Sequence, residues 1–312
     1  LYLASKLFSR SSNPVMGAFH FLQNHTLPHR SASPGVMSRS DRDSGSAHMV
    51  AGSGTCYLEI MCTVVILRRP GHDWPLLMAA NRDEMAGRPW DPPGRHWPDR
   101  ENVVAGIDRL AGGTWMGLND EGVVAGILNR RDSLGPDDTL RSRGEIVLEA
   151  LDHADAADAA EALADLDGRS YRSFNLVVAD NRDAYWIKSM GEPARGAIEV
   201  REIPEGLSML TAFDLNDTAS GRVAFHRPRF EAAAAPDVDA GDWSTWQKLM
   251  ASTEYGDKTD HRDAMRITTD FGFGTLSSSL IALPSVDFND RKPVWLFAGG
   301  APGEAGFAPV DL

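Results

Sequence analysis

The stretch that decides the fold is residues 61–84, which read MCTVVILRRPGHDWPLLMAANRDE. Residues 63–67 are apolar and largely β-branched, residues 70–73 are typical of a turn, and residues 74–80 are apolar again. This pattern predicts two antiparallel strands joined by a moderately long loop that is centred near His72. The sequence therefore predicts a β-hairpin at the start of the folded part of the chain.

The register of this hairpin brings three reactive groups together. Facing residues of an antiparallel pair have a constant index sum, so Cys62 is expected to face the neighbourhood of Arg82 and Asp83. A thiol, a guanidinium and a carboxylate are thus predicted at the open end of one hairpin.

Cys62 follows Met61, and this order suggests a terminal nucleophile. If translation begins at Met61, removal of the methionine leaves Cys62 as the first residue. A terminal cysteine carries a nucleophilic thiol and, in its α-amine, a base that titrates near pH 7.7–8 in reference peptides. The alternative is a buried structural cysteine at the start of a strand. The Arg82 and Asp83 side chains predicted opposite favour the catalytic interpretation.

The first 61 residues differ in texture from the rest. They are rich in Ser, Gly, His and Arg, and residues 35–54 have almost no apolar periodicity, which is typical of disorder. We expect residues 1–61 to be a disordered extension, a propeptide or the product of an upstream start, with an organelle-type leader as a further alternative. Residues 62–312 are expected to form one domain, because they contain no internal repeat and no linker.

The composition limits the classes of function. Hydrophobic residues make up 42% of the 312 residues and charged residues 24%, which is ordinary for a globular protein. The net charge is −13, although residues 1–60 hold five Lys and Arg against three Asp and Glu. The remainder is acidic, which argues against a broad nucleic-acid or anionic-membrane surface.

Cofactor, metal and membrane signals are absent from the sequence. The two cysteines, Cys56 and Cys62, are too few for a disulfide scaffold or a zinc site of four cysteines. No phosphate-binding loop or paired-His metal helix occurs, so we expect no cofactor and no metal. No apolar stretch approaches the roughly 20 residues of a membrane helix, and no secretion signal is evident, so we expect no stable membrane insertion and a cytoplasmic location.

The remaining elements follow from periodicity and turn residues. Residues 123–128 are expected to return as a strand after a tight turn at 119–122, which places Asn129 opposite residues 112–113. Residues 91–102 are predicted to be an irregular loop. Further strands are predicted at 103–106, 174–179, 184–188, 197–203, 207–213, 275–283 and 294–298; helices are predicted within 141–167, with Asp155 as an N-cap, and at 219–235 and 243–250.

Several ordered motifs resemble one known family. The sequence is similar, from residue 61 to about residue 193, to the NRDE family, which is also called the Transport and Golgi organisation 2 family. The resemblance implies an α+β fold of the N-terminal nucleophile (Ntn) hydrolase kind, a four-layer αββα sandwich of two antiparallel sheets. Eukaryotic members are linked to secretory organisation, lipid metabolism and haem trafficking. The motifs are Met61-Cys62, AANRDE at 79–84, Arg88-Pro89, GGTW at 112–115, RGE at 143–145, FNL at 174–176 and GEP at 191–193.

The cysteine Ntn hydrolases, penicillin V acylase and bile salt hydrolase, share a wider pattern with this chain. The resemblance implies that Cys62 is the nucleophile and that its own amine is the base. It also implies that Asp83 holds the amine, that Arg82 favours the thiolate and that the Asn129 amide donates to the oxyanion. Those enzymes carry a further Asn and a late Arg, whereas the comparable stretches here read TAF at 211–213 and TLS at 275–277.

Two functions are expected from this pattern. The first is an Ntn-type cysteine amidohydrolase or acyltransferase that acts on a small amide or thioester. The second is a non-catalytic carrier that uses the same cleft for an acyl lipid, acyl-CoA or haem. The partner in either case is a small molecule, and the sequence leaves both its identity and the oligomeric state open.

Overall fold

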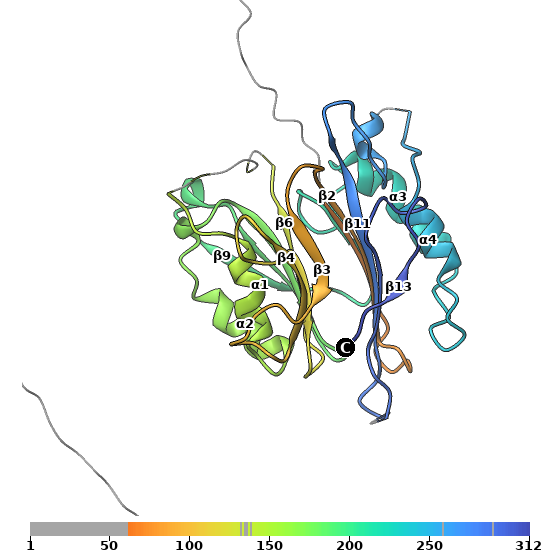
Figure 1. Ribbon diagram of the computed structural model, residues 1–312, viewed down its shortest axis with the longest axis horizontal. Helices are drawn as coiled ribbons and strands as arrows, with labels where there is room; N and C mark the ends of the chain where they lie inside the picture. Colours follow the sequence, from red (N-terminus) through yellow and green to blue (C-terminus); the bar gives the residue numbers. More distant parts are fainter. Residues whose placement is uncertain (1–61, 132, 134–136, 138, 258, 289) are drawn as a thin grey trace, which may run out of the picture. The chain divides into compact units, whose positions relative to one another are not determined.

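The structure, a computed structural model, describes residues 62–312 apart from 132, 134–136, 138, 258 and 289. Residues 1–61 lie outside this part, and so do the predictions made for them. The described chain forms two antiparallel sheets (Figure 1). Sheet A has the order β10 (Gly206–Leu210), β1 (Thr63–Arg68), β2 (Leu76–Met85), β11 (Phe273–Leu283), β12 (Val294–Ala298) and β13 (Ala308–Pro309). Sheet B has the order β3 (Trp90–Gly94), β4 (Val103–Asp108), β5 (Met116–Asn119), β6 (Val124–Asn129), β7 (Phe174–Ala179), β8 (Ala184–Ser189) and β9 (Ile198–Glu202).

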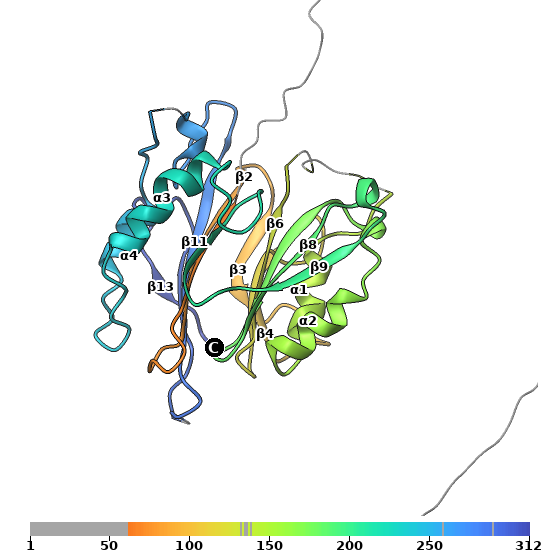
Figure 2. The same cartoon turned by 180° about the vertical axis from the view of Figure 1, so that it is seen from behind.

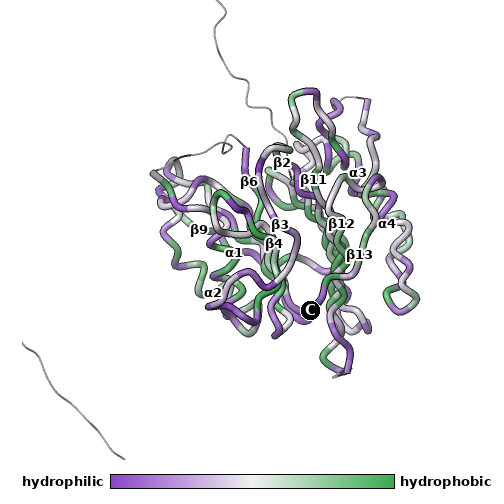
Figure 3. The backbone as a smooth tube through the Cα atoms, viewed as in Figure 1, coloured by the Kyte–Doolittle hydropathy of each residue, from purple (hydrophilic) through white to green (hydrophobic). Residues whose placement is uncertain are grey.

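Helices cover the outer face of each sheet, as the two opposite views show (Figures 1 and 2). The helices are α1 (Gly144–Leu151) and α2 (Ala156–Ala164) on sheet B, and α3 (Gly221–Ala232) and α4 (Ser244–Met250) on sheet A; short 3₁₀ turns are η1 (Gly168–Ser170), η2 (Glu192–Ala194) and η3 (His261–Asp263). Alternate residues of each strand enter the core between the sheets or the core beneath the helices. Hydrophobic residues accordingly follow the strands (Figure 3). The predicted αββα sandwich is confirmed.

The hairpin β1–β2 has the predicted register. Thr63 pairs with Asn81 and Ile66 with Met78, so Cys62, one residue before the ladder, is opposite Arg82. Strand β2 continues through residues 81–84 to Met85. It does so because β11 pairs with it on the other side, where Thr275 faces Asp83. A bulge lies between Thr275 and Ser277. Asn81 is therefore paired on both sides, and residues 82–84 are paired with β11.

Side-chain caps fix the helices where the sequence predicted them. Asp155 accepts a hydrogen bond from the Asp158 amide at 2.8 Å and begins α2. Asn119, in the turn between β5 and β6, donates to the carbonyls of Leu151 and His153 at the end of α1. Pro228 lies within α3 without ending that helix. No helix of the described residues is long and apolar enough to span a membrane.

Two predicted boundaries are wrong for identifiable reasons. The predicted loop at 91–102 contains part of β3, which pairs with β4 in spite of Pro92 and Pro93. This is tolerated because β3 is an edge strand, where a missing N–H faces no partner. The predicted strand at 207–213 ends at Leu210, because the Asn175 side chain takes the carbonyls of Thr211 and Phe213, each at 2.8 Å.

Candidate active site around Cys62

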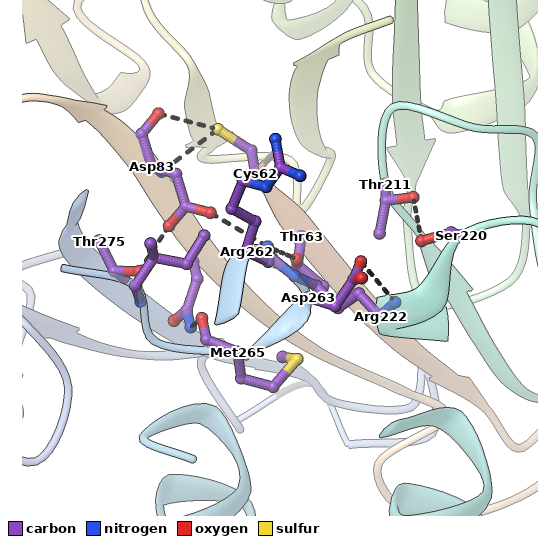
Figure 4. Close-up of polar contacts among 12 residues, drawn as sticks. Cys62, Thr63, Asp83, Thr211, Ser220, Arg222, Arg262, Asp263, Met265 and Thr275 are labelled. Carbon is purple, nitrogen blue, oxygen red and sulfur yellow. Dashed lines mark hydrogen bonds and ion pairs between the residues drawn. The ribbon is translucent and has the colours of Figure 1, made fainter. Parts of the chain in front are cut away.

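The thiol of Cys62 lies against the backbone of β2 (Figure 4). The Asp83 amide donates to Sγ at 3.4 Å, and Sγ is 3.6 Å from the Asp83 carbonyl oxygen. Cys62 is half-buried and packs on the core between the two sheets. The hairpin therefore holds the sulfur at the end of the inter-sheet core, as its register requires.

Arg82 shares the inter-sheet face with Cys62, because residues opposite each other in a ladder point to the same side. Its guanidinium carbon lies 4.5 Å from the ring centroid of Trp115 and 5.9 Å from that of Trp90. Its Nη2 is 3.7 Å from the Glu84 carboxylate. The side chain is only 6% exposed, and Nη1 is buried with no hydrogen-bond partner among the described residues. Arg82 thus presents an unused donor.

Aromatic rings form the wall behind Arg82. Trp90 and Trp115 meet edge to face with their centroids 5.7 Å apart, and Trp90 meets Phe297 in the same way at 6.1 Å. Gly106 makes room for this arrangement, since a Cβ there would lie 2.3 Å from Cη2 of Trp115. The guanidinium is consequently fixed by stacking more than by ion pairing.

A small pocket opens beside the thiol. Most of the lining residues are apolar, and the polar ones include Arg82 and two serines. The lining residues are Cys62, Thr63, Val64, Ala80, Asn81, Arg82, Trp115, Met116, Gly126, Ile127, Leu128, Ser277 and Ser279. A reagent that enters this pocket would meet the sulfur and the guanidinium together.

Asp83 points to the opposite face of sheet A, toward α3. Its Oδ2 accepts from Nη1 of Arg222 at 3.0 Å, and its Oδ1 accepts from the Thr275 hydroxyl at 2.6 Å (Figure 4). The same Nη1 donates to the Thr63 hydroxyl at 2.6 Å. The side chains of Asp83 and Arg222 are fully buried. The Asp83 carboxylate thus lies on the other face of the sheet from the pocket beside the thiol.

The electrostatics at the sulfur differ from the sequence expectation. Burial, followed by the charge of Asp83, raises the pKa of the Cys62 thiol to about 11; the Asp83 amide and Arg82 act in the opposite direction but less strongly. Arg82 therefore favours the thiolate, but less strongly than burial opposes it, and the thiol is protonated at neutral pH. Burial also raises the pKa of Asp83, and Arg222 and Thr275 oppose that rise.

Asn129 ends β6, and its role as an oxyanion donor stays a prediction. The pocket includes Gly126, Ile127 and Leu128 but not Asn129. Strand alternation puts Asn129 on the side of Ala125 and Ile127, which belong to the core beneath α1 and α2. A donor role would require the strand end to twist toward the sulfur.

The sequence analysis missed the buried partners of Asp83. Arg222 lies 139 residues further along the chain, in a helix with little apolar pattern, so no local signal connects it to the site. Asn175, noted only as part of a motif, has a fully used side chain: Nδ2 holds two carbonyls, and Oδ1 accepts from Arg130 and from Trp186. Within the described residues, no three His, Cys, Asp or Glu side chains gather as a metal site would require.

The architecture defines the fold. Two stacked antiparallel sheets between helical layers, with a cysteine ahead of the first strand, form the fold of Ntn hydrolases. A Caenorhabditis elegans N-acylethanolamine-hydrolyzing acid amidase ortholog superimposes with a TM-score of 0.51 at 12% identity over 74% of this chain and 98% of its own. Penicillin V acylase from Agrobacterium tumefaciens gives 0.48 at 15% identity over 80% and 86%. The likeness to the acid amidase ortholog, at 12% identity, shows the shared fold alone.

The sequence defines the family within that fold. The family profile described as Transport and Golgi organisation 2 matches residues 61–282, and the chain belongs to this family. The human Transport and Golgi organization protein 2 homolog is 33% identical over 110 residues, and the mouse homolog is 31% identical over 108. Each alignment covers 34% of this chain and 38% of the relative, so the chain spans well under half of the relatives it matches.

Proposed function

We propose that the chain is an Ntn-type cysteine amidohydrolase or acyltransferase that acts on a small amide or thioester through Cys62. The observation that carries this proposal is the thiol at the wall of a pocket, beside a buried guanidinium with an unused Nη1. Members of this fold class, including the C. elegans acid amidase ortholog, support the reaction type by analogy only.

The proposal requires a base, because the thiol pKa of about 11 leaves little thiolate at neutral pH. We propose that the active chain begins at Cys62, that residues 1–61 are removed or never made, and that residues 62–312 form the working domain. The free α-amine then takes the thiol proton as sulfur attacks the substrate carbonyl carbon. Asp83 holds the amine in its protonated form.

Each half of the reaction balances within this set of groups. When the tetrahedral intermediate collapses, the carbon–nitrogen or carbon–sulfur bond breaks, and the leaving group takes the proton from the terminal ammonium. The acyl group is left as a thioester on Cys62. Water or an acceptor amine or alcohol then attacks this thioester, its proton passes to the sulfur by way of the α-amine, and the thiol is restored.

Two residues are assigned to the substrate oxygen. Arg82 Nη1 is positioned beside the pocket to receive a carbonyl oxygen or a neighbouring anionic group of the substrate. Asn129 is the second proposed donor, and its test is Asn129→Ala. A large loss of turnover with unchanged stability supports the donor role, whereas a loss of stability alone makes it a structural residue.

The test uses the chain released with Cys62 as its first residue from a cleavable N-terminal fusion. Intact-mass analysis confirms the terminus, and a panel of N-acyl amides and acyl thioesters is assayed for turnover and for an acyl adduct on Cys62. A chain that retains Met61 is the matched control, because it keeps the thiol and lacks the free amine. Turnover that is equal in the two chains, or absent in both, contradicts the catalytic proposal.

A carrier of an acyl lipid, acyl-CoA or haem is the second candidate. The largely apolar pocket wall and the raised thiol pKa favour it, because a carrier needs apolar surface and no thiolate. Saturable binding of an acyl-CoA or haem, measured by calorimetry without turnover or adduct, would support the carrier over the enzyme.

A further inference from the structure

Arg222 joins the two strands of the site from behind. Its guanidinium donates to Asp83 Oδ2 at 3.0 Å on β2, to the Thr63 hydroxyl at 2.6 Å on β1, and to the Arg262 carbonyl at 2.8 Å in η3. Its backbone amide donates to Asp263 at 3.1 Å, which fixes the first turn of α3 (Figure 4). One side chain therefore spans the residue after the nucleophile and the carboxylate beside it.

The contact between Arg222 and Asp83 supplies a cation that the stretch at 275–277 does not. The stretch at 275–277 holds no arginine, and Thr275 there supplies only a hydroxyl, to the other oxygen of Asp83. A buried carboxylate with a hydroxyl as its one partner would favour the neutral form, because burial penalises charge. The buried cation that balances Asp83 comes instead from α3, in the layer of helices.

We propose that Arg222 is a positioning residue of the Cys62 site, which keeps the Asp83 carboxylate charged and fixes it against the start of β1. The inference rests on the proposed function in one respect, that Asp83 serves the amine of Cys62. Arg222 itself lies behind the sheet and touches no substrate.

The groups around Asp83 give this role an unusual signature. Arg222 faces Asp83 from α3, and Thr275 faces it from β11. Cys62 and Arg82 lie on the other face of the sheet, and Asp263 accepts a hydrogen bond from the backbone amide of Arg222. The Asp83 charge raises the pKa of the thiol. Without Arg222, Asp83 becomes neutral, the thiol ionises more readily, and the amine loses its partner. Thiol reactivity should therefore rise while turnover falls.

The experiment measures both quantities in the chain that begins at Cys62. For Arg222→Gln we expect the thiol pKa, from iodoacetamide rates against pH, to fall by about one unit, so that alkylation below that pKa is about tenfold faster. Turnover should fall at least about tenfold. Arg222→Lys keeps the charge and should retain the wild-type thiol pKa and most of the turnover.

Arg68→Gln is the matched control for the loss of a buried arginine. Arg68 lies at the far end of β1 and binds Glu202 at 2.9 Å and the Arg182 carbonyl at 3.1 Å, away from Asp83. It should leave the thiol pKa unchanged. A lower thiol pKa in Arg68→Gln, or an unchanged one in folded Arg222→Gln, overturns the inference.

Two further outcomes keep the proposals separate. All rates are measured below the cooperative unfolding transition of each variant, and if Arg222→Gln does not fold, Thr275→Val takes its place. That variant removes the other partner of Asp83, so the thiol pKa should fall in the same direction by a smaller amount; no change overturns the inference. Wild-type protein without turnover, but with the expected pKa shifts, refutes the proposed function and leaves the charge-keeping role of Arg222 intact.

Discussion

The two faces of β2 at the site differ in how completely their polar groups are satisfied. On the helix side, both oxygens of Asp83 are bound, by Arg222 and Thr275, and all three residues are buried. On the inter-sheet side, Arg82 is stacked on tryptophan and keeps a buried Nη1 without a partner among the described residues. Arg222 is thus held by an ion pair with Asp83, whereas Arg82 is held by stacking on tryptophan.

This difference indicates that one face of β2 has a structural role and the other is available to a ligand. A buried carboxylate with both oxygens bound is held rigidly, whereas a buried donor without a partner is costly unless something binds to it. The helix side therefore fixes the geometry, and the inter-sheet side is the face open to a ligand. Changes on the helix side should alter stability most, and changes on the inter-sheet side should alter the thiol with a smaller loss of stability.

The largest effect is expected from Asp83→Asn. This change leaves Arg222 charged and buried without its carboxylate, and breaking such a pair costs about 3–5 kcal/mol in unfolding free energy. Arg222→Gln should cost less, because an abandoned aspartate can bind a proton and arginine cannot lose one. Urea denaturation at pH 7 measures both. A cost for Arg222→Gln equal to or above that of Asp83→Asn would contradict this reasoning.

The next effect concerns acid stability on the helix side. His226, buried one turn after Arg222, has its pKa lowered to about 4 by burial and by the charges of Arg222 and Arg229. The unfolded chain binds this proton near pH 6.5, so the stability is complete above that pH and is lost as the pH falls toward 4. The loss approaches about 3 kcal/mol. Unfolding free energies at pH 7 and pH 4 should differ less in His226→Gln, and an identical difference would rule out His226 as the cause.

A smaller effect is expected on the inter-sheet side from Gly106→Ala. The added methyl would lie 2.3 Å from the Trp115 ring, so the ring must move and the unfolding free energy should fall by about 1–3 kcal/mol. A changed tryptophan fluorescence spectrum should accompany the loss. Gly87→Ala is the control, because a Cβ there meets no heavy atom within 4 Å. Equal losses in the two variants would show that Trp115 has room to spare.

The smallest effect is expected from Arg82→Met, which keeps the apolar stem and removes the charge. Stability should change by less than about 1 kcal/mol, because stacking is partly retained and an unsatisfied donor disappears. The thiol pKa should rise, since Arg82 lowers it, and alkylation near neutral pH should slow by about threefold. A faster reaction would assign Arg82 to shielding the thiol from the reagent.

Local pattern predicted most of the fold. The β1–β2 hairpin, the Asp155 cap and five strands of sheet B, β4 and β6 to β9, each follow from short-range signals, namely periodicity, turn residues and index sums. The same index sum placed Cys62 opposite Arg82. Errors arose where distant segments decide the structure. Strand β10 ends early because the Asn175 side chain donates to the Thr211 carbonyl just after it, and β3 forms because β4 lies beside it.

The site was predictable only on the face that the hairpin itself creates. Alternation along β2 sends Asp83 to the opposite side from Cys62, and its partner there is set by how α3 packs on the sheet. No spacing within one strand identifies Arg222. The thiol pKa is raised although Arg82 favours the thiolate, because burial, which depends on the whole sandwich, outweighs the neighbouring guanidinium.

The two prolines of β3 have a consequence for association. Sheet B ends at this strand, and an exposed sheet edge can pair with the edge of another molecule through its free N–H and C=O groups. Pro92 and Pro93 offer no N–H, and the pairing with β4 shifts between Asp91 and Gly94. A strand added from another copy would find missing donors and a broken repeat, so this border of the sheet resists the edge-to-edge growth that begins aggregation.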